Sequence, residues 1–203
     1  MPKGLAKERQ REYYYRKAKE EQYRSRATYK LLQAVRKYGF IQSGDVVVDL
    51  GAAPGGWSQA AGKLVGQQGF VLGIDIEHIE PFNLHNVHTA KGDVSDPEIT
   101  GQILEILPRS ADAVISDVSP NISGIWELDH ARQIDLAGKS LQIAAAVLRP
   151  RGNFFVKVFH GDMLKGFVEE VKHDFSSVKF VKPRASRKKS SEIYVLGLRL
   201  KRT

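Results

Sequence analysis

Short runs of β-branched and apolar residues alternate along most of the chain with segments whose apolar residues repeat every three or four positions. The first pattern is typical of buried strands and the second of amphipathic helices. The pattern predicts strands at residues 45–51, 70–76, 86–93, 111–117, 152–159, 176–182 and 191–201. It predicts helices between them at residues 56–65, 96–107, 126–150 and 162–175. Asp96 and Pro97 should open the second of these helices, and Pro150 should end the third.

Strands that alternate with helices predict an α/β fold with helices on both faces of a mostly parallel sheet. We therefore expect three layers and seven strands. The last two strands are joined by only PRASRKKSS (183–191), which is shorter than the crossover that a parallel pair needs. The last strand should therefore run antiparallel to its neighbour.

The N-terminal part of the chain is basic and predicted to be helical. Residues 5–23 are strong helix formers without an apolar face wide enough to join a core. The next helix has such a face and should end near Gly39; its apolar members are Ala27, Leu31, Leu32 and Val35. A chain of 203 residues fits one domain of ordinary size. We therefore expect a basic arm at 1–23 and a single domain at 24–203.

The formal net charge of +8 is divided unevenly along the chain. Residues 1–39 hold 12 Lys and Arg against 4 Glu, and residues 182–203 hold 8 Lys and Arg against one Glu. Residues 40–181 hold 11 basic and 18 acidic residues. Two basic ends favour a polyanionic partner held by both, whereas the surface charge of thermophilic proteins would mix the signs.

Composition also excludes several kinds of site. The chain has no cysteine, which excludes disulfides, thiolate metal sites and cysteine nucleophiles. None of the six histidines has the spacing of a helical ligand pair, so we expect no metal site. No apolar run approaches the roughly 20 residues that span a bilayer, and the first residues lack the apolar core of a signal peptide. We therefore expect a cytoplasmic protein that does not bind membranes.

The segment VVVDLGAAPGGWSQ (46–59) joins a predicted strand to a predicted helix through a glycine-rich loop. A Walker loop would need a lysine after the glycines, where Trp57 and Ser58 stand. A dinucleotide loop would need a glycine where the chain has Ala53. The interpretation that remains is a nucleoside ligand without phosphates.

Two carboxylates end the next two predicted strands. Asp75 lies 24 positions after Gly51, close to the spacing of about 20 at which an acid meets ribose hydroxyls in such folds. Asp93 suits an acceptor for an adenine amino group. Either acid alone could instead cap a helix. Together, at the carboxyl ends of neighbouring strands, they favour a ligand with ribose, adenine and an amino-acid tail, which is S-adenosylmethionine.

Five stretches resemble, in order, the FtsJ family of RNA 2′-O-ribose methyltransferases: SRATYKL, VVDLGAAPGGWSQ, DVSPN, FFVKVFHG and SRKKSSEIYVL. The resemblance runs from about residue 24 to residue 200. It implies a Rossmann-like class I S-adenosylmethionine-dependent methyltransferase. It also implies a catalytic set of two lysines and two acids in which Lys157 accepts the proton. This set is Lys30, Asp117, Lys157 and Glu192.

The motifs also indicate where the cofactor and the RNA should bind. The residues expected at the cofactor are Gly51, Ala52, Pro54, Gly55, Gly56, Trp57, Asp75, Ile76, Asp93, Val94 and Asp117. The residues expected to contact RNA are Arg24, Arg26, Arg184, Arg187, Lys188 and Lys189. Because Lys30 and Glu192 must meet in one site, the two basic ends should lie close together.

A ribose hydroxyl is a weak nucleophile, so the enzyme must orient it and remove its proton. A lysine acts as a base only after losing its own proton. The second lysine lowers the pKa of the first and favours this loss, whereas the two carboxylates raise that pKa and oppose it. Lys157 could therefore be a base or a cation that stabilises the developing alkoxide. Lys157 could also be a lysine on the sheet edge with its ammonium in water. Glu192 could pair with lysines of its own loop, and Lys30 could bind a phosphate.

Other functions fit the sequence less well. Methylation of pyrimidine C5 needs a cysteine nucleophile, and methylation of a base amino group usually needs an aromatic residue where DVSPN has Asn121. An RNA-binding protein without catalysis would have lost part of the catalytic set, and an NAD-linked oxidoreductase is disfavoured by Ala53. Size and basic arm are most like family members that methylate large-subunit (23S-type) ribosomal RNA. We expect a monomer acting on a uridine of that RNA or of a ribosomal particle, with a tRNA anticodon-loop nucleotide as the alternative.

Overall fold

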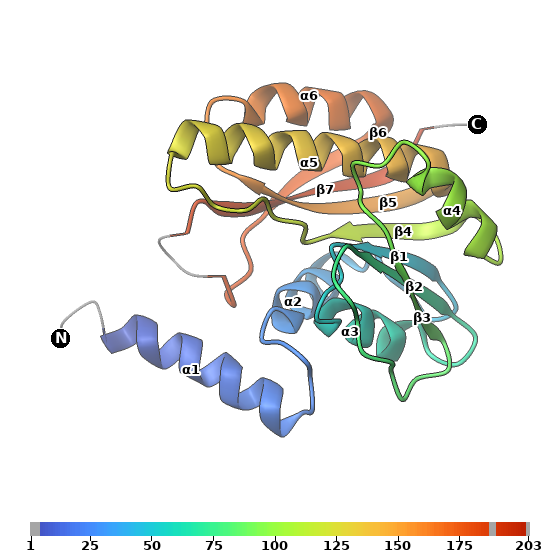
Figure 1. Cartoon of the computed structure of the whole chain (residues 1–203), viewed down its shortest axis with the longest axis horizontal. Helices are drawn as coiled ribbons and strands as arrows, with labels where there is room; N and C mark the ends of the chain where they lie inside the picture. The colour runs from blue at the N-terminus through green and yellow to red at the C-terminus, as the bar shows by residue number, and fades with distance from the viewer. Residues whose placement is uncertain (1–4, 187–189, 202–203) are drawn as a thin grey trace.

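The computed structural model describes residues 5–186 and 190–201, with side chains from residue 12 onward. Two helices precede an alternation of strands and helices (Figure 1). The helices are α1 (Leu5–Glu20), α2 (Thr28–Tyr38), α3 (Gly56–Val65), α4 (Ile99–Ile106), α5 (Trp126–Val147) and α6 (Leu164–Asp174). The strands are β1 (Val46–Leu50), β2 (Phe70–Asp75), β3 (Val87–Lys91), β4 (Ala111–Ser116), β5 (Leu148–Phe159), β6 (Phe175–Val181) and β7 (Glu192–Leu200).

The seven strands form one sheet in the order β3-β2-β1-β4-β5-β7-β6. The first five strands in this order are parallel, and β7 runs antiparallel to both β5 and β6. The predicted α/β fold with an antiparallel last strand is therefore confirmed. β1 lies third in the sheet, so the carboxyl ends of β2, β1, β4 and β5 meet at one edge.

Helices cover both faces of the sheet, as expected for three layers. Figure 1 shows α4, α5 and α6 on one face and α2 and α3 on the other. Leu50, Val114 and Phe154 belong to the core under α5 and α6, whereas Val47 and Phe155 belong to the core under α2 and α3. All five residues of β1 are buried, because this strand is covered on both faces.

The predicted boundary between α5 and β5 and the predicted start of α4 are wrong. The long helix ends at Val147 instead of continuing to Pro150, because Leu148 is already extended and pairs with Ala111 of β4. β5 therefore begins four residues earlier than predicted and contains Pro150, and its register with β4 shifts before Asn153. The helix expected at 96–107 begins at Ile99, and the Asp96 carboxylate instead accepts a hydrogen bond from Glu98 N in the turn before it.

Helix α1 lies apart from the sheet and contacts the body through its C-terminal half (Figure 1). The Tyr14 ring packs 5.3 Å from the Tyr29 ring of α2, and its hydroxyl accepts a hydrogen bond from Gln33 Nε2. Ala18 is buried in the same cluster, whereas Tyr13 and Tyr15 are exposed. The division into an arm and a domain at residue 23 stays a prediction. Within the described residues no helix is both long and apolar enough to cross a membrane.

Candidate active site

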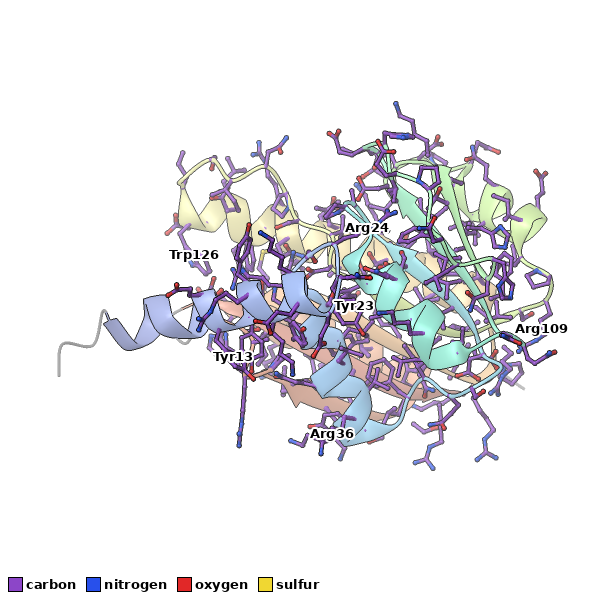
Figure 2. The ribbon with its side chains drawn as sticks, turned by 90° about the horizontal axis from the view of Figure 1, so that it is seen from below. Tyr13, Tyr23, Arg24, Arg36, Arg109 and Trp126 are labelled. Atoms are coloured by element: carbon purple, nitrogen blue, oxygen red, sulfur yellow. The ribbon has the colours of Figure 1, made fainter. Side chains whose placement is uncertain are left out.

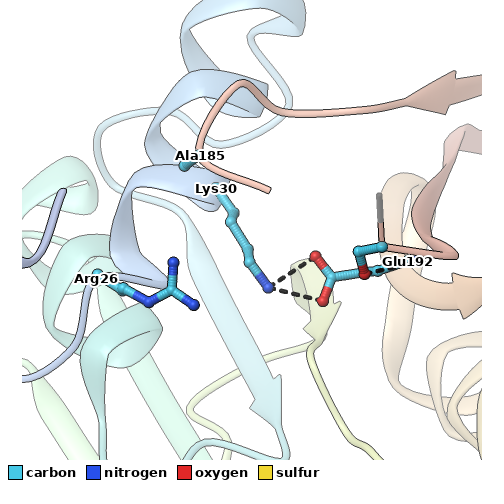
Figure 3. A pocket seen from close by; sticks show the side chains of 5 residues that line it. Arg26, Lys30, Ala185 and Glu192 are labelled. Carbon is cyan, nitrogen blue, oxygen red and sulfur yellow. Dashed lines mark hydrogen bonds and ion pairs between the residues drawn. The ribbon is translucent and has the colours of Figure 1, made fainter. Parts of the chain in front are cut away.

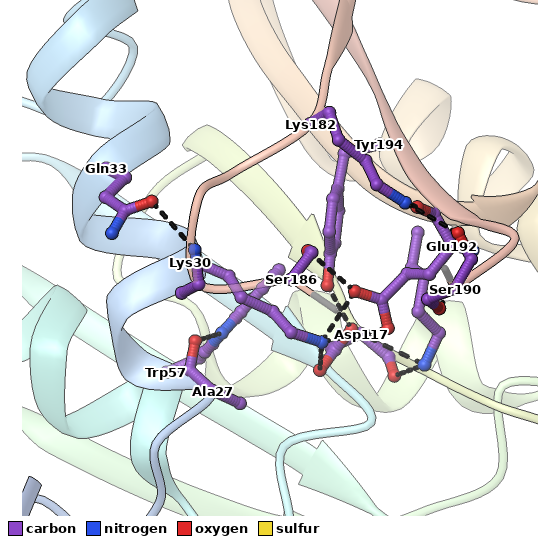
Figure 4. A network of polar contacts seen from close by, with 12 residues as sticks. Ala27, Lys30, Gln33, Trp57, Asp117, Lys182, Ser186, Ser190, Glu192 and Tyr194 are labelled. Carbon is purple, nitrogen blue, oxygen red and sulfur yellow. Dashed lines mark hydrogen bonds and ion pairs between the residues drawn. The ribbon is translucent and has the colours of Figure 1, made fainter. Parts of the chain in front are cut away.

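The four residues of the predicted catalytic set come together at the carboxyl edge of the sheet. Figure 4 labels three of them, Lys30, Asp117 and Glu192. Lys30 lies on α2, Asp117 directly follows β4, Lys157 lies near the end of β5, and Glu192 begins β7. The antiparallel register places Lys157 opposite Tyr194. Glu192 is two residues from Tyr194, and the strand period of two brings its side chain to the same face.

The charged groups form one connected cluster. Lys30 Nζ lies 2.8 Å from Glu192 Oε1 and 4.0 Å from Asp117 Oδ2. Lys157 Nζ lies 3.4 Å from Asp117 Oδ1 and donates a hydrogen bond of 2.6 Å to the Asp117 carbonyl oxygen. Two cations and two anions thus balance in a site where the Lys157 side chain is only 7% exposed. An ammonium has three N–H donors, so Lys157 keeps one beyond the two that face Asp117.

Sequence reasoning missed Tyr194, which belongs to this cluster. Its buried hydroxyl donates a hydrogen bond of 2.8 Å to Asp117 Oδ1. Burial, and then the charge of Asp117, raise the pKa of Tyr194 well above its ordinary value, so the phenol stays protonated. Burial also raises the pKa of Asp117, but Lys157, Lys30 and the Tyr194 hydroxyl outweigh it and hold that pKa below its ordinary value. Strand alternation from Glu192 to Tyr194 is the sequence signal that could have revealed this residue.

A polar pocket of about 220 Å³ opens beside Lys30 and Glu192 (Figure 3). Its other lining residues are Arg26, Ala185 and Ser190. Ser186 Oγ donates a hydrogen bond of 3.0 Å to Glu192 Oε1, and Lys182 Nζ donates to the Glu192 carbonyl oxygen. Ala185 N also donates a hydrogen bond of 3.1 Å to Gln33 Oε1, so the described residues just after β6 contact α2.

The residues expected to contact RNA have different surroundings. Arg26 lines the pocket and Arg184 is exposed. Three further expected contacts, Arg187, Lys188 and Lys189, lie outside the described residues. The RNA contacts stay predictions.

The glycine loop turns from β1 to α3 against the end of β2. The amides of Gly51 and Ala52 both donate to the Ile74 carbonyl oxygen, at 2.9 and 3.1 Å. Asp75 Oδ2 accepts a hydrogen bond of 2.8 Å from Ala53 N, and Oδ1 accepts one of 2.9 Å from Glu77 N. Each carboxylate oxygen has a second lone pair, so Asp75 can hold the loop and still accept from a ligand hydroxyl.

The other predicted cofactor residues differ in accessibility. Ile76, Asp93 and Pro54 are exposed at this edge, Ile76 to 57%. Val94 is buried in the core. Gly55 and Gly56 begin α3, and the peptide before Pro54 is cis. The Trp57 ring is buried, stacks 5.7 Å from Phe155 and donates a hydrogen bond to the Ala27 carbonyl oxygen. The side chain of Trp57 therefore joins the glycine loop to α2.

The Arg24 side chain contacts the outside of the glycine loop and the segment that follows β2. Its guanidinium donates to the carbonyl oxygens of Pro54 at 3.3 Å, Glu80 at 2.6 Å and Pro81 at 2.5 Å. The same group lies 3.7 Å from the centroid of the Phe82 ring. We expected Arg24 to contact RNA, yet three of its five N–H groups donate to the chain's own backbone, beside Gly55.

Replacing Arg24 by alanine should therefore raise the Kd for S-adenosylmethionine about tenfold without any RNA present, because the three hydrogen bonds by which its charged group joins the loop to the segment after β2 are lost. Calorimetric titration measures this Kd. Arg36→Ala, at an exposed arginine of α2, is the matched control and should leave the Kd unchanged. Equal affinities for Arg24→Ala and wild type would show that the hydrogen bonds of Arg24 do not shape the cofactor loop.

Asp49, in the centre of β1, is a fully buried acid behind the glycine loop. Its Oδ2 accepts a hydrogen bond of 2.6 Å from Ser58, and its Oδ1 has no partner among the described residues. Burial raises the pKa of Asp49 to about 7, and the charges of Asp117 and Asp75 act in the same direction.

Folding therefore favours the protonated form of Asp49. Below the ordinary aspartate pKa of 3.8 the acid is neutral in both states, whereas between this value and about pH 7 only the unfolded chain has released the proton. The unfolding free energy of wild type should fall relative to Asp49→Asn by a few kcal/mol as the pH rises through this window, and level off above it. Urea unfolding of both proteins across the window measures the difference. A constant difference would mean that Asp49 does not titrate on folding.

The sheet order, the glycine loop after β1 and the acids that end β2 and follow β3 define the class of this protein: it has the class I S-adenosylmethionine-dependent methyltransferase fold. Solved structures agree. A Plasmodium falciparum protein assigned as a ribosomal RNA methyltransferase matches with a TM-score of 0.79 and 25% identity, over 88% of this chain and 98% of that one. Aeropyrum pernix fibrillarin, solved with bound S-adenosyl-L-methionine, shares the fold at a TM-score of 0.59 and 14% identity, over 87% of this chain and 75% of that one.

The sequence comparisons identify the family. The sequence model of the FtsJ-like methyltransferases matches residues 23–200. The ribosomal RNA large subunit methyltransferase E of Methanocaldococcus jannaschii is 50% identical over 95% of this chain and 80% of its own length. The protein of that name from Methanothermobacter thermautotrophicus is 47% identical over 97% of this chain and 93% of its own. The chain belongs to the FtsJ-like methyltransferase family, as its motifs predict.

Proposed function

We propose that this protein transfers the methyl group of S-adenosylmethionine to a ribose 2′-hydroxyl of large-subunit ribosomal RNA, at a uridine. The observation that carries the proposal is the cluster of Lys30, Asp117, Lys157 and Glu192 beside the glycine loop. The relatives that are about half identical over nearly the whole chain are named for methylation of this RNA. We further propose that the protein works in the cytoplasm as a monomer and accepts the RNA in a ribosomal particle.

The residues at the glycine loop fit S-adenosylmethionine. The Asp75 carboxylate faces the loop with lone pairs to spare for ribose hydroxyls, and the exposed Ile76 offers an apolar surface for the adenine. Asp93 is the acceptor proposed for the adenine amino group. The small residues of the loop let its backbone approach the cofactor closely; they are Gly51, Ala52, Gly55 and Gly56. The loop has no lysine that could bind a phosphate. When bound, S-adenosylmethionine supplies an electrophilic methyl group on a sulfonium.

The chain's own residues would prepare the ribose hydroxyl. Lys157 Nζ has one donor beyond its contacts with Asp117, and this donor can hold the hydroxyl oxygen. Asp117 stays ionised because Lys157, Lys30 and Tyr194 lower its pKa, and its contacts with Lys157 Nζ hold that group in position. Lys30, held by both Glu192 oxygens, adds a second positive charge near the oxygen as it loses its proton. If Lys157 is deprotonated, a lone pair replaces this third donor and accepts the hydroxyl proton. If Lys157 stays an ammonium, the proton goes to solvent and the third donor stabilises the alkoxide.

RNA would approach from the side where the two basic ends of the chain meet. Ala185 and Ser190 line the pocket together with Arg26 and Lys30, and Ala185 packs in one cluster with Ala18 of α1. The same helix carries Arg16, Lys17 and Lys19. Cations along this path would hold phosphates, so RNA affinity should fall steeply with salt. The proposal keeps the arm at 1–23 as the part that grips RNA.

The test uses the whole chain with methyl-labelled S-adenosylmethionine. Separate reactions receive free large-subunit ribosomal RNA, assembled large subunits and bulk tRNA, and each RNA is then digested to nucleosides. Label in 2′-O-methyluridine from ribosomal RNA or subunits supports the proposal. Label confined to tRNA overturns the substrate, and label in a base-methylated nucleoside overturns the ribose acceptor. Absence of transfer to every RNA would favour an RNA-binding protein without catalysis.

A further inference from the structure

A small apolar patch is exposed at the same edge of the sheet as the charged cluster. It consists of Ile122, Ile125 and Trp126 in the segment after β4, and Met163 in the segment after β5; we call it the edge patch. Trp126 is 44% exposed although it is the first residue of a helix that packs on the sheet. The proposed catalytic cluster does not use any of these side chains.

The Trp126 ring is held in place. It stacks on His130 at 5.7 Å with an interplanar angle of 13°, and on Phe159 at 6.0 Å with an angle of 24°. His130 Nε2 accepts a hydrogen bond from Met163 N, which ties the two parts of the patch together. The Asp129 carboxylate accepts from the amides of Ser123 and Gly124 and fixes the segment before Trp126. An aromatic ring that is already ordered in the free protein loses little conformational entropy when a ligand binds to it.

The edge patch is close to the catalytic cluster through Phe159. The segment that carries it begins at Asp117, and Phe159, on which Trp126 stacks, lies two residues after Lys157 and pairs with Glu192 across the sheet. Trp126 is therefore one ring away from the catalytic strands, and Figure 2 shows it on the side toward which α1 extends.

We propose that Trp126 is a stacking platform for an unpaired base of the RNA, next to the nucleotide whose ribose is methylated. The inference rests on the proposed function. An RNA whose ribose reaches Lys157 must place neighbouring bases close by, and exposed aromatic rings bind unpaired bases of any sequence through their faces. The edge patch carries no charge, so it would hold bases while the basic ends of the chain hold phosphates.

A protein partner fits the patch less well. A stable protein interface covers about 800 Å² on each side, far more than four side chains supply. Asn121, Ser123 and Glu127 interrupt the apolar surface in sequence and are themselves exposed. One exposed ring with small apolar neighbours has the size of a base.

The experiment compares binding of two probes to the whole chain. One is a single-stranded oligouridylate, and the other is a ribose-phosphate oligomer of the same length without bases. Wild type should prefer the oligouridylate about tenfold, and Trp126→Ala should lose this preference while binding the base-free oligomer as wild type does. Trp126→Tyr should keep the preference. Leu104→Ala, which removes an exposed apolar side chain of α4, is the control and should bind as wild type.

Two further measurements separate stacking from a structural role. Oligouridylate should quench the indole fluorescence of wild type but not of Trp126→Tyr, because the other tryptophan, Trp57, is buried. The salt dependence of binding should be the same for wild type and Trp126→Ala. An equal loss of affinity for both probes, or an unchanged preference in Trp126→Ala, would overturn the platform. Such a result would leave ribose methylation by wild type intact, so the two proposals fail separately.

Discussion

Replacing Lys157 by alanine is expected to reduce methyl transfer to RNA about 10³-fold, with the Kd for S-adenosylmethionine within about twofold of wild type. The ammonium is 3.4 Å from Asp117 Oδ1 and donates to the Asp117 carbonyl oxygen, and it provides the remaining donor for the ribose hydroxyl. Its loss removes both the contact to the reacting oxygen and the cation that balances Asp117. Single-turnover transfer measures the chemical step, and calorimetry measures cofactor binding.

Lys157→Arg separates the two roles that remain for the lysine. A guanidinium keeps its charge but cannot be deprotonated in proteins, so it can stabilise an alkoxide but cannot accept a proton. We expect this variant to be as inactive as Lys157→Ala, as a base role requires. Near-normal turnover would instead assign Lys157 a purely electrostatic role. Lys179→Ala, at an exposed lysine of β6, is the matched control for the loss of a strand lysine and should retain full activity.

The fold was predictable where local signals and the sheet pattern agree. Gly39, with a φ of +63°, ends α2 as expected, and α3 has the predicted bounds because Gly55 and Gly66 flank it. The end of α5 was not predictable in this way. Leu148 continues the helical period of its segment, but pairing with Ala111 across the sheet draws it into β5. Such a boundary depends on a partner strand that local pattern does not contain.

The candidate site also has residues that local patterns could predict and residues that depend on distant partners. The glycine loop and Asp75 follow from spacing, because they lie at the ends of consecutive strands. The pairing of Lys30 with Glu192 joins residues 162 positions apart, and only the family resemblance brought them together before the structure. Arg24 shows what sequence reasoning could not find. A basic residue next to a basic arm predicts a contact with an RNA phosphate, yet the Arg24 guanidinium donates hydrogen bonds to three backbone carbonyl oxygens. Every residue carries a backbone carbonyl, so the sequence cannot show which of them will accept a hydrogen bond from a given side chain.

Replacing Gly51 by alanine is expected to abolish detectable cofactor binding and to lower the unfolding free energy by about 2–4 kcal/mol. Gly51 has a φ of +74°, which a side chain disfavours, and an added Cβ would lie 2.7 Å from Val118 Cα and 2.8 Å from Val118 N. These are backbone atoms that cannot rotate away. The clash must displace either the glycine loop or the segment that begins at Asp117, so cofactor and catalytic groups would lose their alignment.

Gly44→Ala is the control that isolates the cost of the backbone conformation. Gly44 also has a positive φ, of +83°, but nothing lies within 4 Å of an added Cβ. This variant should lose only about 1 kcal/mol of unfolding free energy and should bind S-adenosylmethionine as wild type does. Urea unfolding and calorimetry of both variants give the comparison. Equal losses of stability in the two, with cofactor binding retained in Gly51→Ala, would mean that the contact between Gly51 and Val118 does not hold the two halves of the site together.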